Sequence, residues 1–254
     1  MKKFEGKWLP PADKFKNACI EIVNSNLENF KRHPIYSSFI GNDLRNEQIA
    51  INFYRHVEKN YSYLLKEETL KQFLNNDRIG NPFTYNIDGI VISPGTLRFM
   101  RVLGDIIEIY DEMSDIIEIG SGYGGQSLII KSYFNDINYT LVDIPESLSV
   151  AKRYLMENNF EPTFIDTNDV SVNDYYDLVI SDYCLSELDV EGIEFYINNI
   201  INKCKYAYIT ANSMGILFDE LVKQLNNIFD NVEIIPELPK TSNNDNHIII
   251  CKDN

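Results

Sequence analysis

The sequence after Ser114 consists of short apolar runs that alternate with more polar segments. The apolar runs cover residues 115–119, 139–144, 162–166, 176–181, 206–211, 232–236 and 247–252. The first five runs are separated by helix-length segments, apart from the short 168–175 link, which is typical of βαβ units. The 237–246 connection between the last two runs has no room for a helix, so the final strand is expected to run antiparallel beside its predecessor. The pattern predicts an α/β fold with a seven-stranded, Rossmann-like sheet.

The residues before this region follow a helical pattern, with apolar side chains three and four residues apart in the segments 15–30 and 49–57. A further helix is expected over residues 94–112, because Ser93 is a good N-cap and Pro94 suits the first helical position. Two short β-prone runs between turn residues predict one small irregular insert ahead of that helix. This part of the chain is therefore expected to be a mostly helical cap.

The two parts also differ in charge. Residues 1–112 carry equal numbers of acidic and basic side chains, so the formal net charge of −15 falls entirely on residues 113–254. We expect a helical cap over the first range and a Rossmann-like domain over the second. Such a strongly acidic chain repels a phosphate backbone, which argues against a nucleic-acid partner. The asymmetry has two readings: the acidic part is a solvated surface that aids solubility, or the neutral, Arg-bearing first part meets an anionic substrate.

The glycine-rich segment from Glu118 to Gly125 follows the first strand of the expected sheet and opens a helix. Glycines at such a turn let the backbone approach a ligand closely, and the N–H groups at the helix start face that ligand. Asp143 ends the second strand, about 20 residues further on. A carboxylate there can accept hydrogen bonds from both hydroxyls of a ribose, so the segment predicts a nucleoside-containing cofactor.

Two cofactors fit the glycine spacing. Gly120, Gly122 and Gly125 satisfy the GxGxxG pattern of dinucleotide-binding proteins, which leaves a nicotinamide enzyme as an alternative. Glu118, Gly120, Gly122 and Gly124 satisfy ExGxGxG, which resembles motif I of the class I S-adenosylmethionine-dependent methyltransferases. The acidic residue ahead of the glycines and the lack of a Tyr-x-x-x-Lys pair favour the second cofactor. A non-catalytic partner that keeps the fold is a third possibility.

Longer motifs resemble one family within that class, the bacterial sugar O-methyltransferases of capsule and surface polysaccharide biosynthesis. The motifs are EIGSGYGGQS at 118–127, LVDIPESLSVAKRYL at 141–155, YDLVISDYCLSELD at 176–189 and CKYAYITAN at 204–212. The resemblance covers residues 90–215 well, although this chain has Asp182 where the family pattern has Asn. It implies O-methylation of a sugar or sugar nucleotide, with S-adenosylhomocysteine as the second product. A small phosphorylated or amino-bearing capsule precursor is the alternative acceptor.

The resemblance also implies which residues contact the cofactor. They are Glu118, Gly120, Ser121, Gly122, Gly124, Asp143, Ile144, Asp166, Thr167, Asn168 and Ser181. Glu118 is expected to anchor the loop or the methionine amine, and the Ser181 carbonyl to meet that amine. Asp143 is expected to hold the ribose, and Ile144 to flank the adenine. The residues after the third strand are expected near the adenine amino group, although Asp166 could equally be a helix cap.

Methyl transfer to an alcohol needs alignment of the oxygen with the methyl carbon and a base that accepts the hydroxyl proton. Glu187 and His247 are the first candidates for that base, with Asp182 and His56 behind them. A structural role is an open alternative for each histidine, and Glu187 could instead be a carboxylate at a helix start. Tyr183, which also follows the fourth strand, is expected to contact the substrate.

Two arginines near the start of the 94–112 helix are candidate ligands of a sugar-nucleotide diphosphate. Arg98 and Arg101 could bind it together, although Arg101 could instead pair with Asp105 one turn on. The histidines and acidic residues form no convincing metal spacing, so no metal is expected.

The remaining features concern the setting of the protein. The four cysteines form no CxxC pair, which is typical of reduced thiols in a cytoplasmic protein. The first residues have no apolar core of a signal peptide, and no apolar stretch is long enough for a membrane span. A homodimer through the N-terminal helices is a possible assembly.

Overall fold

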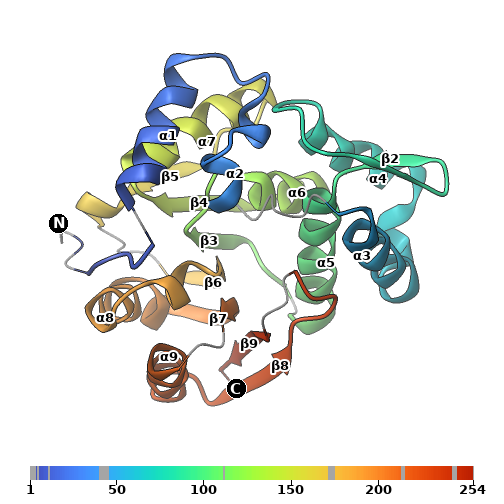
Figure 1. Ribbon diagram of the computed structural model, residues 1–254. Coiled ribbons are helices and arrows are strands. Elements are labelled where there is room, and N and C mark those ends of the chain that lie inside the picture. The colour runs from blue at the N-terminus through green and yellow to red at the C-terminus, as the bar shows by residue number, and fades with distance from the viewer. Residues whose placement is uncertain are drawn as a thin grey trace.

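A seven-stranded sheet with helices on both faces forms the centre of the computed structural model (Figure 1). The structure describes residues 4, 6–10, 12–39, 46–110, 112–170, 175–212, 215–241 and 245–253. Within these ranges, no helix has the length and apolar character that crossing a bilayer requires. The α/β architecture expected from the alternating apolar runs is confirmed.

The sheet contains all seven strands that the apolar runs predict. They are β3 (Asp115–Ile119), β4 (Asn138–Asp143), β5 (Thr163–Asp166), β6 (Tyr176–Asp182), β7 (Cys204–Asn212), β8 (Asn231–Pro236) and β9 (Asn246–Lys252). Their order across the sheet is β5-β4-β3-β6-β7-β9-β8. The last strand, β9, runs antiparallel to β8, as expected, and it also inserts between β8 and β7 and pairs antiparallel with both.

The two faces of the sheet are covered by different helices. On one face lie α5 (Pro94–Ile109), α6 (Gly125–Tyr133) and α7 (Pro145–Glu157), and on the other lie α8 (Val190–Asn199) and α9 (Ile216–Asn226). Successive side chains of a strand point to opposite faces. Accordingly, Ile116 belongs to the first buried cluster and Ile117 to the second. Between β5 and β6 the described residues form a 3₁₀ turn at Thr167–Asp169, in keeping with the short link expected there.

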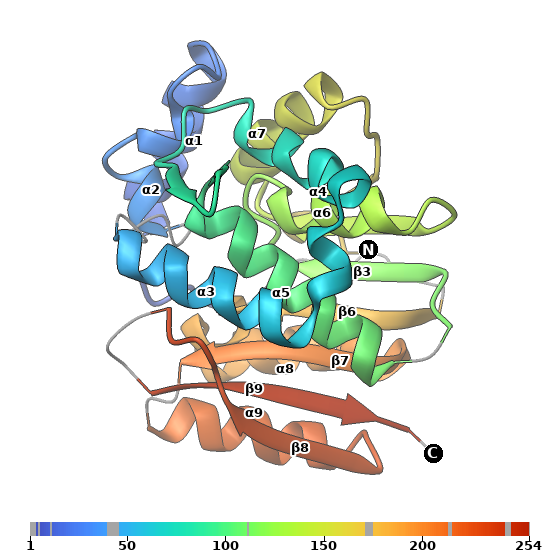
Figure 2. The same cartoon turned by 90° about the vertical axis from the view of Figure 1, so that its right-hand side faces the viewer.

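The N-terminal helices lie on the outside of the first layer of helices (Figure 2). They are α1 (Ala12–Asn24), α2 (Tyr36–Phe39), α3 (Glu47–Asn60) and α4 (Glu67–Phe73), with 3₁₀ turns at Phe30–Arg32, Ser62–Leu65 and Leu74–Asp77. Helix α1 packs on α7, α3 on α5 and α4 on α6. The irregular insert expected before α5 is a hairpin of β1 (Tyr85–Ile87) and β2 (Ile90–Ile92). One continuous buried cluster joins these helices to the sheet.

Helix α5 connects the N-terminal region to the sheet. Its expected N-cap is confirmed, because the Ser93 hydroxyl accepts a hydrogen bond from Thr96 N at 3.1 Å and Pro94 is the first helical residue. The helix packs between α3 and the sheet, so its polar residues Arg98, Arg101 and Asp105 are buried. Arg101 does pair with Asp105 one turn on, as the sequence allowed, and tertiary packing buries this pair.

Candidate active site

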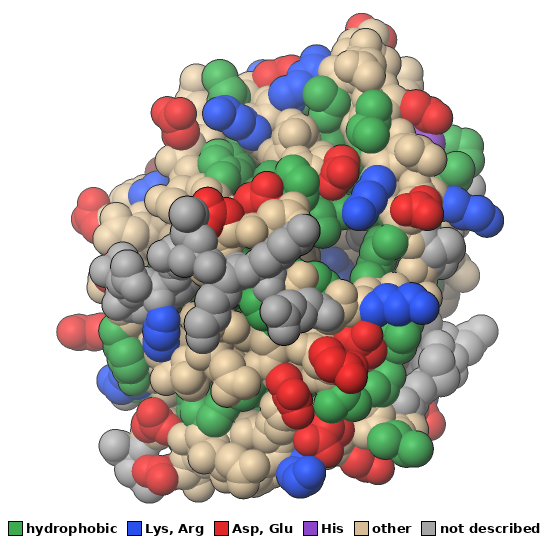
Figure 3. All heavy atoms as spheres, turned by 90° about the vertical axis from the view of Figure 1, so that its left-hand side faces the viewer, with side chains coloured by type: hydrophobic (Ala, Val, Ile, Leu, Met, Phe, Trp, Pro, Cys, Tyr) green, Lys and Arg blue, Asp and Glu red, His purple; other side chains and the backbone are tan. Residues whose placement is uncertain are grey.

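A cavity of about 1030 Å³ opens at the carboxyl ends of the parallel strands. It lies where the strand order reverses, between β3 and β6, which is the usual ligand site in open α/β sheets. The glycine-rich loop, the ends of β4 and β6, helix α1 and the first residues of the chain line it. On the face shown in Figure 3, acidic and basic side chains stand side by side around a hollow.

The glycine-rich loop forms the floor of the cavity, and its conformation requires glycine. Gly120, Gly122 and Gly124 have φ angles of +76°, +55° and +80°. A Cβ on Gly120 would lie 2.3 Å from the Cys184 Cβ, and one on Gly124 would lie 2.7 Å from a Leu155 methyl. Such contacts and angles exclude ordinary side chains. Gly120, Gly122 and Gly125 line the cavity, so a ligand can approach the loop at the start of α6 without meeting side chains at these positions.

Asp143 ties this loop to the end of β4. Its Oδ2 accepts hydrogen bonds from Gly122 N and the Ser147 hydroxyl, both at 2.9 Å, and its Oδ1 accepts one from Ile144 N at 2.8 Å. Burial raises the pKa of Asp143 to about 6, against the opposing effect of these hydrogen bonds. A carboxylate has about four acceptor positions. The sequence suggested contacts with both ribose hydroxyls, but this arrangement leaves room for about one further donor.

Glu118 lies beneath the loop and is nearly inaccessible to solvent. Its carboxylate accepts a hydrogen bond from the Tyr139 hydroxyl at 2.8 Å. Burial is the main cause that raises the pKa of Glu118 to about 8, and the nearby charges of Asp182 and Asp143 also raise this pKa. The Tyr139 hydrogen bond and the charge of Arg98 act in the opposite direction. Glu118 also lines the cavity, so it can meet a polar ligand group there.

The residues expected around the adenine occupy the β4 and β5 ends of the cavity. Ile144, Thr167 and Asn168 line it. Asp166 is not among the described lining residues, and it caps the following turn by accepting from Asn168 N at 2.7 Å. The helix-cap reading of Asp166 therefore matches its geometry. The Ser181 side chain is fully buried at the end of β6, adjacent to the lining residue Asp182.

The opposite half of the cavity holds candidate residues for the acceptor. Asp182 Oδ1 accepts a hydrogen bond from the Thr210 hydroxyl at 2.8 Å, and Arg98 Nη2 lies 4.0 Å from Asp182 Oδ2. Tyr183 has a φ of +66°, and its hydroxyl donates to Glu237 at 2.7 Å. Glu187 follows at the rim, and burial raises the pKa of its carboxyl. These candidates come together because they follow the end of β6.

The first residues of the chain also enter the cavity, which sequence reasoning missed. We call residues 6–10 the N-terminal strap; it passes between α1 and α8 (Figure 1). Leu9 N donates to the Glu187 carbonyl at 2.9 Å, and Asp189 N donates to the Lys7 carbonyl at 3.0 Å. The Trp8 indole donates to Glu187 Oε2 at 3.0 Å. The sequence indicates this contact only by the position of its single tryptophan, which precedes Pro10 and an amphipathic helix.

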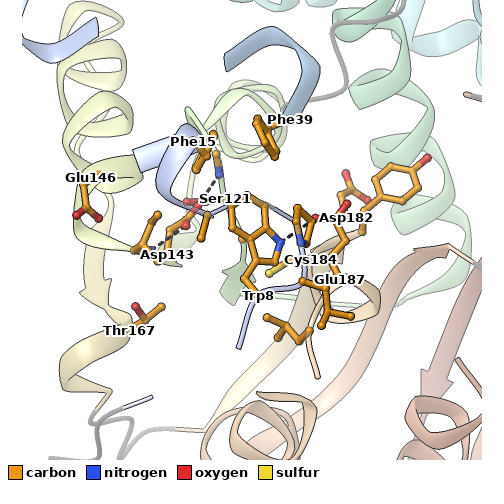
Figure 4. A pocket seen from close by; sticks show the side chains of 18 of the residues that line it. Trp8, Phe15, Phe39, Ser121, Asp143, Glu146, Thr167, Asp182, Cys184 and Glu187 are labelled. Carbon is orange, nitrogen blue, oxygen red and sulfur yellow. Dashed lines mark hydrogen bonds between the residues drawn. The ribbon is translucent and has the colours of Figure 1, made fainter. Parts of the chain in front are cut away.

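Trp8 stands between the two halves of the cavity (Figure 4). Asp143 and Thr167 lie on one side of it, and Asp182 and Glu187 on the other. The rings of Phe15 and Phe39 each lie about 5.4 Å from the Trp8 ring and extend this aromatic wall. The cavity therefore has one polar half at the glycine loop and one half where aromatic and carboxylate groups meet.

Three sequence candidates lie elsewhere. His247 is the second residue of β9, but its ring packs 5.7 Å from Phe218 on the α9 side of the sheet and not over the cavity. His56 lies on α3 and packs its ring against Tyr61, and burial lowers the pKa of His56. Arg101 is 1% exposed, and its guanidinium binds Asp105, Tyr208 and Glu237. None of the three is among the described residues that line the cavity. For His247 the reason is that strand direction alone does not determine which face of the sheet a side chain takes.

Several buried polar atoms along the cavity wall lack partners among the described residues. They are Arg98 Nε, Ser121 Oγ, Gln126 Oε1, Glu146 Oε2 and Asp182 Oδ2, and all five residues line the cavity. Buried polar atoms in proteins are nearly always hydrogen-bonded. These atoms run from the start of α7, past the glycine loop, to the end of β6. The residues that carry these atoms therefore form a continuous polar stretch of the wall, from the start of α7 to the end of β6.

Comparison with known proteins identifies the fold. No protein-family model matches the chain, and no curated protein matches it. A methyltransferase from Pyrococcus furiosus superposes with a TM-score of 0.51 over 75% of this chain and 98% of its own, at 16% identity. A proposed O-methyltransferase from Nostoc punctiforme PCC 73102 superposes with a TM-score of 0.50 over 61% of this chain and 55% of its own, also at 16% identity. The chain thus has the class I methyltransferase fold.

Proposed function

We propose that this protein is an S-adenosylmethionine-dependent O-methyltransferase. The observation that carries the proposal is the cavity wall itself. It combines glycine-loop residues that line the cavity, the Asp143 carboxylate at the next strand end and a row of buried polar atoms without partners among the described residues. The fold supports the same reading. A nicotinamide enzyme would need a second nucleotide site, and no observation favours one.

The residues of the glycine-loop half would hold the cofactor. Ile144, Thr167 and Asn168 would border the adenine, and Asp143 would accept a ribose hydroxyl. The backbone of the loop, beginning at Gly120, would contact the chain that joins the ribose to the amino acid. S-adenosylmethionine, when bound, supplies an electrophilic methyl group.

The other half of the cavity has room for the acceptor. Its volume reaches the upper end of the ligand-site range, about 300–1,000 Å³, so two ligands fit. Trp8 and Phe39 offer flat apolar surfaces of the kind that pack on a sugar ring. Glu187 would accept the proton of the reacting hydroxyl, because burial moves its pKa toward the neutral range where a base works best. Trp8 orients that carboxylate.

The acceptor class rests on the sequence motifs. Their resemblance to bacterial sugar O-methyltransferases supports a sugar or sugar nucleotide of surface polysaccharide biosynthesis, and the aromatic wall is compatible with it. A small non-sugar capsule precursor is the alternative acceptor. Screening both groups of compounds for release of S-adenosylhomocysteine would separate them.

Calorimetric titration with S-adenosylmethionine, S-adenosylhomocysteine and NADH tests the cofactor assignment. We expect micromolar binding of the two sulfur nucleotides and none of NADH. Asp143→Ala is expected to weaken that binding by about 10- to 100-fold, because it removes a charged acceptor and releases Gly122 N. Ser149→Ala, which removes an exposed hydroxyl from α7, is the control and should bind like wild type. Binding of NADH alone would overturn the proposal.

The affinity for S-adenosylhomocysteine should depend on pH. A ribose hydroxyl donates to the ionised form of Asp143, and this form is lost as the pH falls through about 6. We therefore expect roughly three- to fivefold weaker binding at pH 5.5 than at pH 8. Asp143→Asn should remove this step while keeping any contribution of Glu118, which both proteins share. An unchanged pH profile in the variant would assign the titration to another group.

A further inference from the structure

Arg98 is a buried cation with incomplete partners in the cavity wall. The residue is 8% exposed, its Nε has no hydrogen-bond partner among the described residues, and its nearest reported carboxylate is Asp182 at 4.0 Å. Asp182 Oδ2 is likewise without a hydrogen-bond partner in the described part of the chain. Buried charges are stable when they are paired and hydrogen-bonded at close range. Both residues line the cavity, and the described part of the protein leaves the hydrogen bonding of this charged pair incomplete.

Arg101, on the same helix, differs from Arg98 because its guanidinium is paired with carboxylates at close range. Its Nη1 lies 2.7 Å from Asp105 and its Nη2 lies 3.3 Å from Glu237. That guanidinium is held within the protein and is not among the described residues lining the cavity. The two arginines cannot clamp one diphosphate, because only Arg98 faces the cavity. The role expected for the pair from the sequence is therefore wrong.

The charges around Arg98 restrict the kind of ligand. A phosphate group would meet one guanidinium with the Asp182 carboxylate 4.0 Å away, so this carboxylate would oppose its charge. A zwitterion is matched instead, since its anionic end can bind Arg98 while its cationic end binds Asp182. A guanidinium binds a carboxylate through two parallel hydrogen bonds, which suits this role.

The position of Arg98 places this pair beside the glycine loop. Phe99 packs so tightly on the loop that a Cβ on Gly125 would lie 2.5 Å from its ring. The charge of Arg98 also acts on Glu118 beneath the loop. The pair therefore lies at the end of the cavity opposite the adenine-side residues Ile144 and Thr167, where Figure 4 shows Asp182.

We propose that Arg98 binds the α-carboxylate and Asp182 the α-ammonium group of the methionyl end of S-adenosylmethionine. This inference rests on the proposed function and assigns both residues to the cofactor. Asp182 then has no part in accepting the hydroxyl proton, which leaves Glu187 as the base.

Titration with two ligands tests the assignment without knowledge of the acceptor. S-adenosylhomocysteine carries the amino-acid end, whereas 5′-methylthioadenosine lacks it. Arg98→Gln and Asp182→Asn are each expected to weaken binding of the first ligand by about 10- to 100-fold. Binding of 5′-methylthioadenosine should stay within about twofold of wild type. Arg98→Lys should fall between wild type and Arg98→Gln, since it keeps the charge but not the paired hydrogen bonds.

Lys14→Gln is the matched control, because Lys14 is an exposed cation that lines the same cavity from α1. It should change neither affinity by more than about twofold. If Arg98→Gln or Arg98→Lys leaves binding of S-adenosylhomocysteine unchanged, or weakens both ligands equally, the assignment is overturned while the proposed function stands. If the wild-type protein binds neither ligand, both proposals fail. If the Arg98→Gln variant does not fold, the Arg98→Lys variant still tests the assignment.

Discussion

Arg101→Ala is expected to lower the free energy of unfolding by about 3–5 kcal/mol. The Arg101 guanidinium is 1% exposed and stands between Asp105 and Glu237, with a further hydrogen bond to Tyr208. Its removal leaves two acidic groups in the interior without their cation, and the helix α5 loses its link to β7 and to the segment after β8. Chemical denaturation followed by circular dichroism measures the change.

Arg55→Ala is the control for this substitution. Arg55 also pairs with two carboxylates, Glu58 and Asp88, but these side chains are about half exposed and solvated. Surface ion pairs contribute little, so the unfolding midpoint of this variant should stay close to that of wild type. Equal midpoints for Arg101→Ala and wild type would show that the buried network does not stabilise the fold.

Glu187→Gln is expected to reduce kcat by about 10²–10⁴ with an acceptor identified by the screen described above. The amide keeps the shape of the carboxylate but cannot take up the proton of the acceptor hydroxyl. Affinity for S-adenosylhomocysteine should be unchanged, because Glu187 is not among the residues proposed to hold the cofactor and lies on the far side of Trp8 from Asp143 (Figure 4). Release of S-adenosylhomocysteine under saturating substrate measures the rate.

Trp8→Phe tests the role of Trp8 in positioning the Glu187 carboxylate separately from the proton transfer to that carboxylate. It keeps an aromatic ring but removes the N–H that donates to Glu187 and lowers the pKa of that carboxyl. Activity requires the ionised form, so the loss of rate at acid pH should begin at a higher pH in this variant. Glu187→Gln should have no such titration. Full activity of Glu187→Gln at neutral pH would assign the base to another group.

Local sequence patterns predicted most of the fold. The order of strands and helices after Ser114 follows from short apolar runs, and the start of α5 follows from Ser93 and Pro94. These signals are local, because hydrophobic period and cap chemistry act over a few residues. These local signals did not predict the insertion of β9 between β7 and β8. It depends on pairing between strands that are far apart in the chain.

The same distinction runs through the candidate site. The glycine loop and Asp143 were predictable, because glycine spacing and a strand-end carboxylate are read directly from the sequence. His247 was misplaced, since neither its strand nor that strand's direction decides whether the ring faces the cavity or α9. Trp8 was missed, because only the path of the N-terminal strap brings it to Glu187, 179 residues away.

The two arginines of α5, Arg98 and Arg101, show most clearly what could not be predicted from the sequence. The sequence by itself determined that both lie near the start of one helix that precedes the glycine loop. Only the tertiary structure decided that Arg101 is enclosed by Asp105 and Glu237 while Arg98 faces the cavity. Helical periodicity orders residues around an axis, but the partners that neutralise a buried charge come from β7, β6 and the segment after β8. Asp105 lies one turn along the same helix and could be predicted locally, whereas Glu237 and Asp182 are brought to α5 by packing over the whole chain, which a local pattern does not encode.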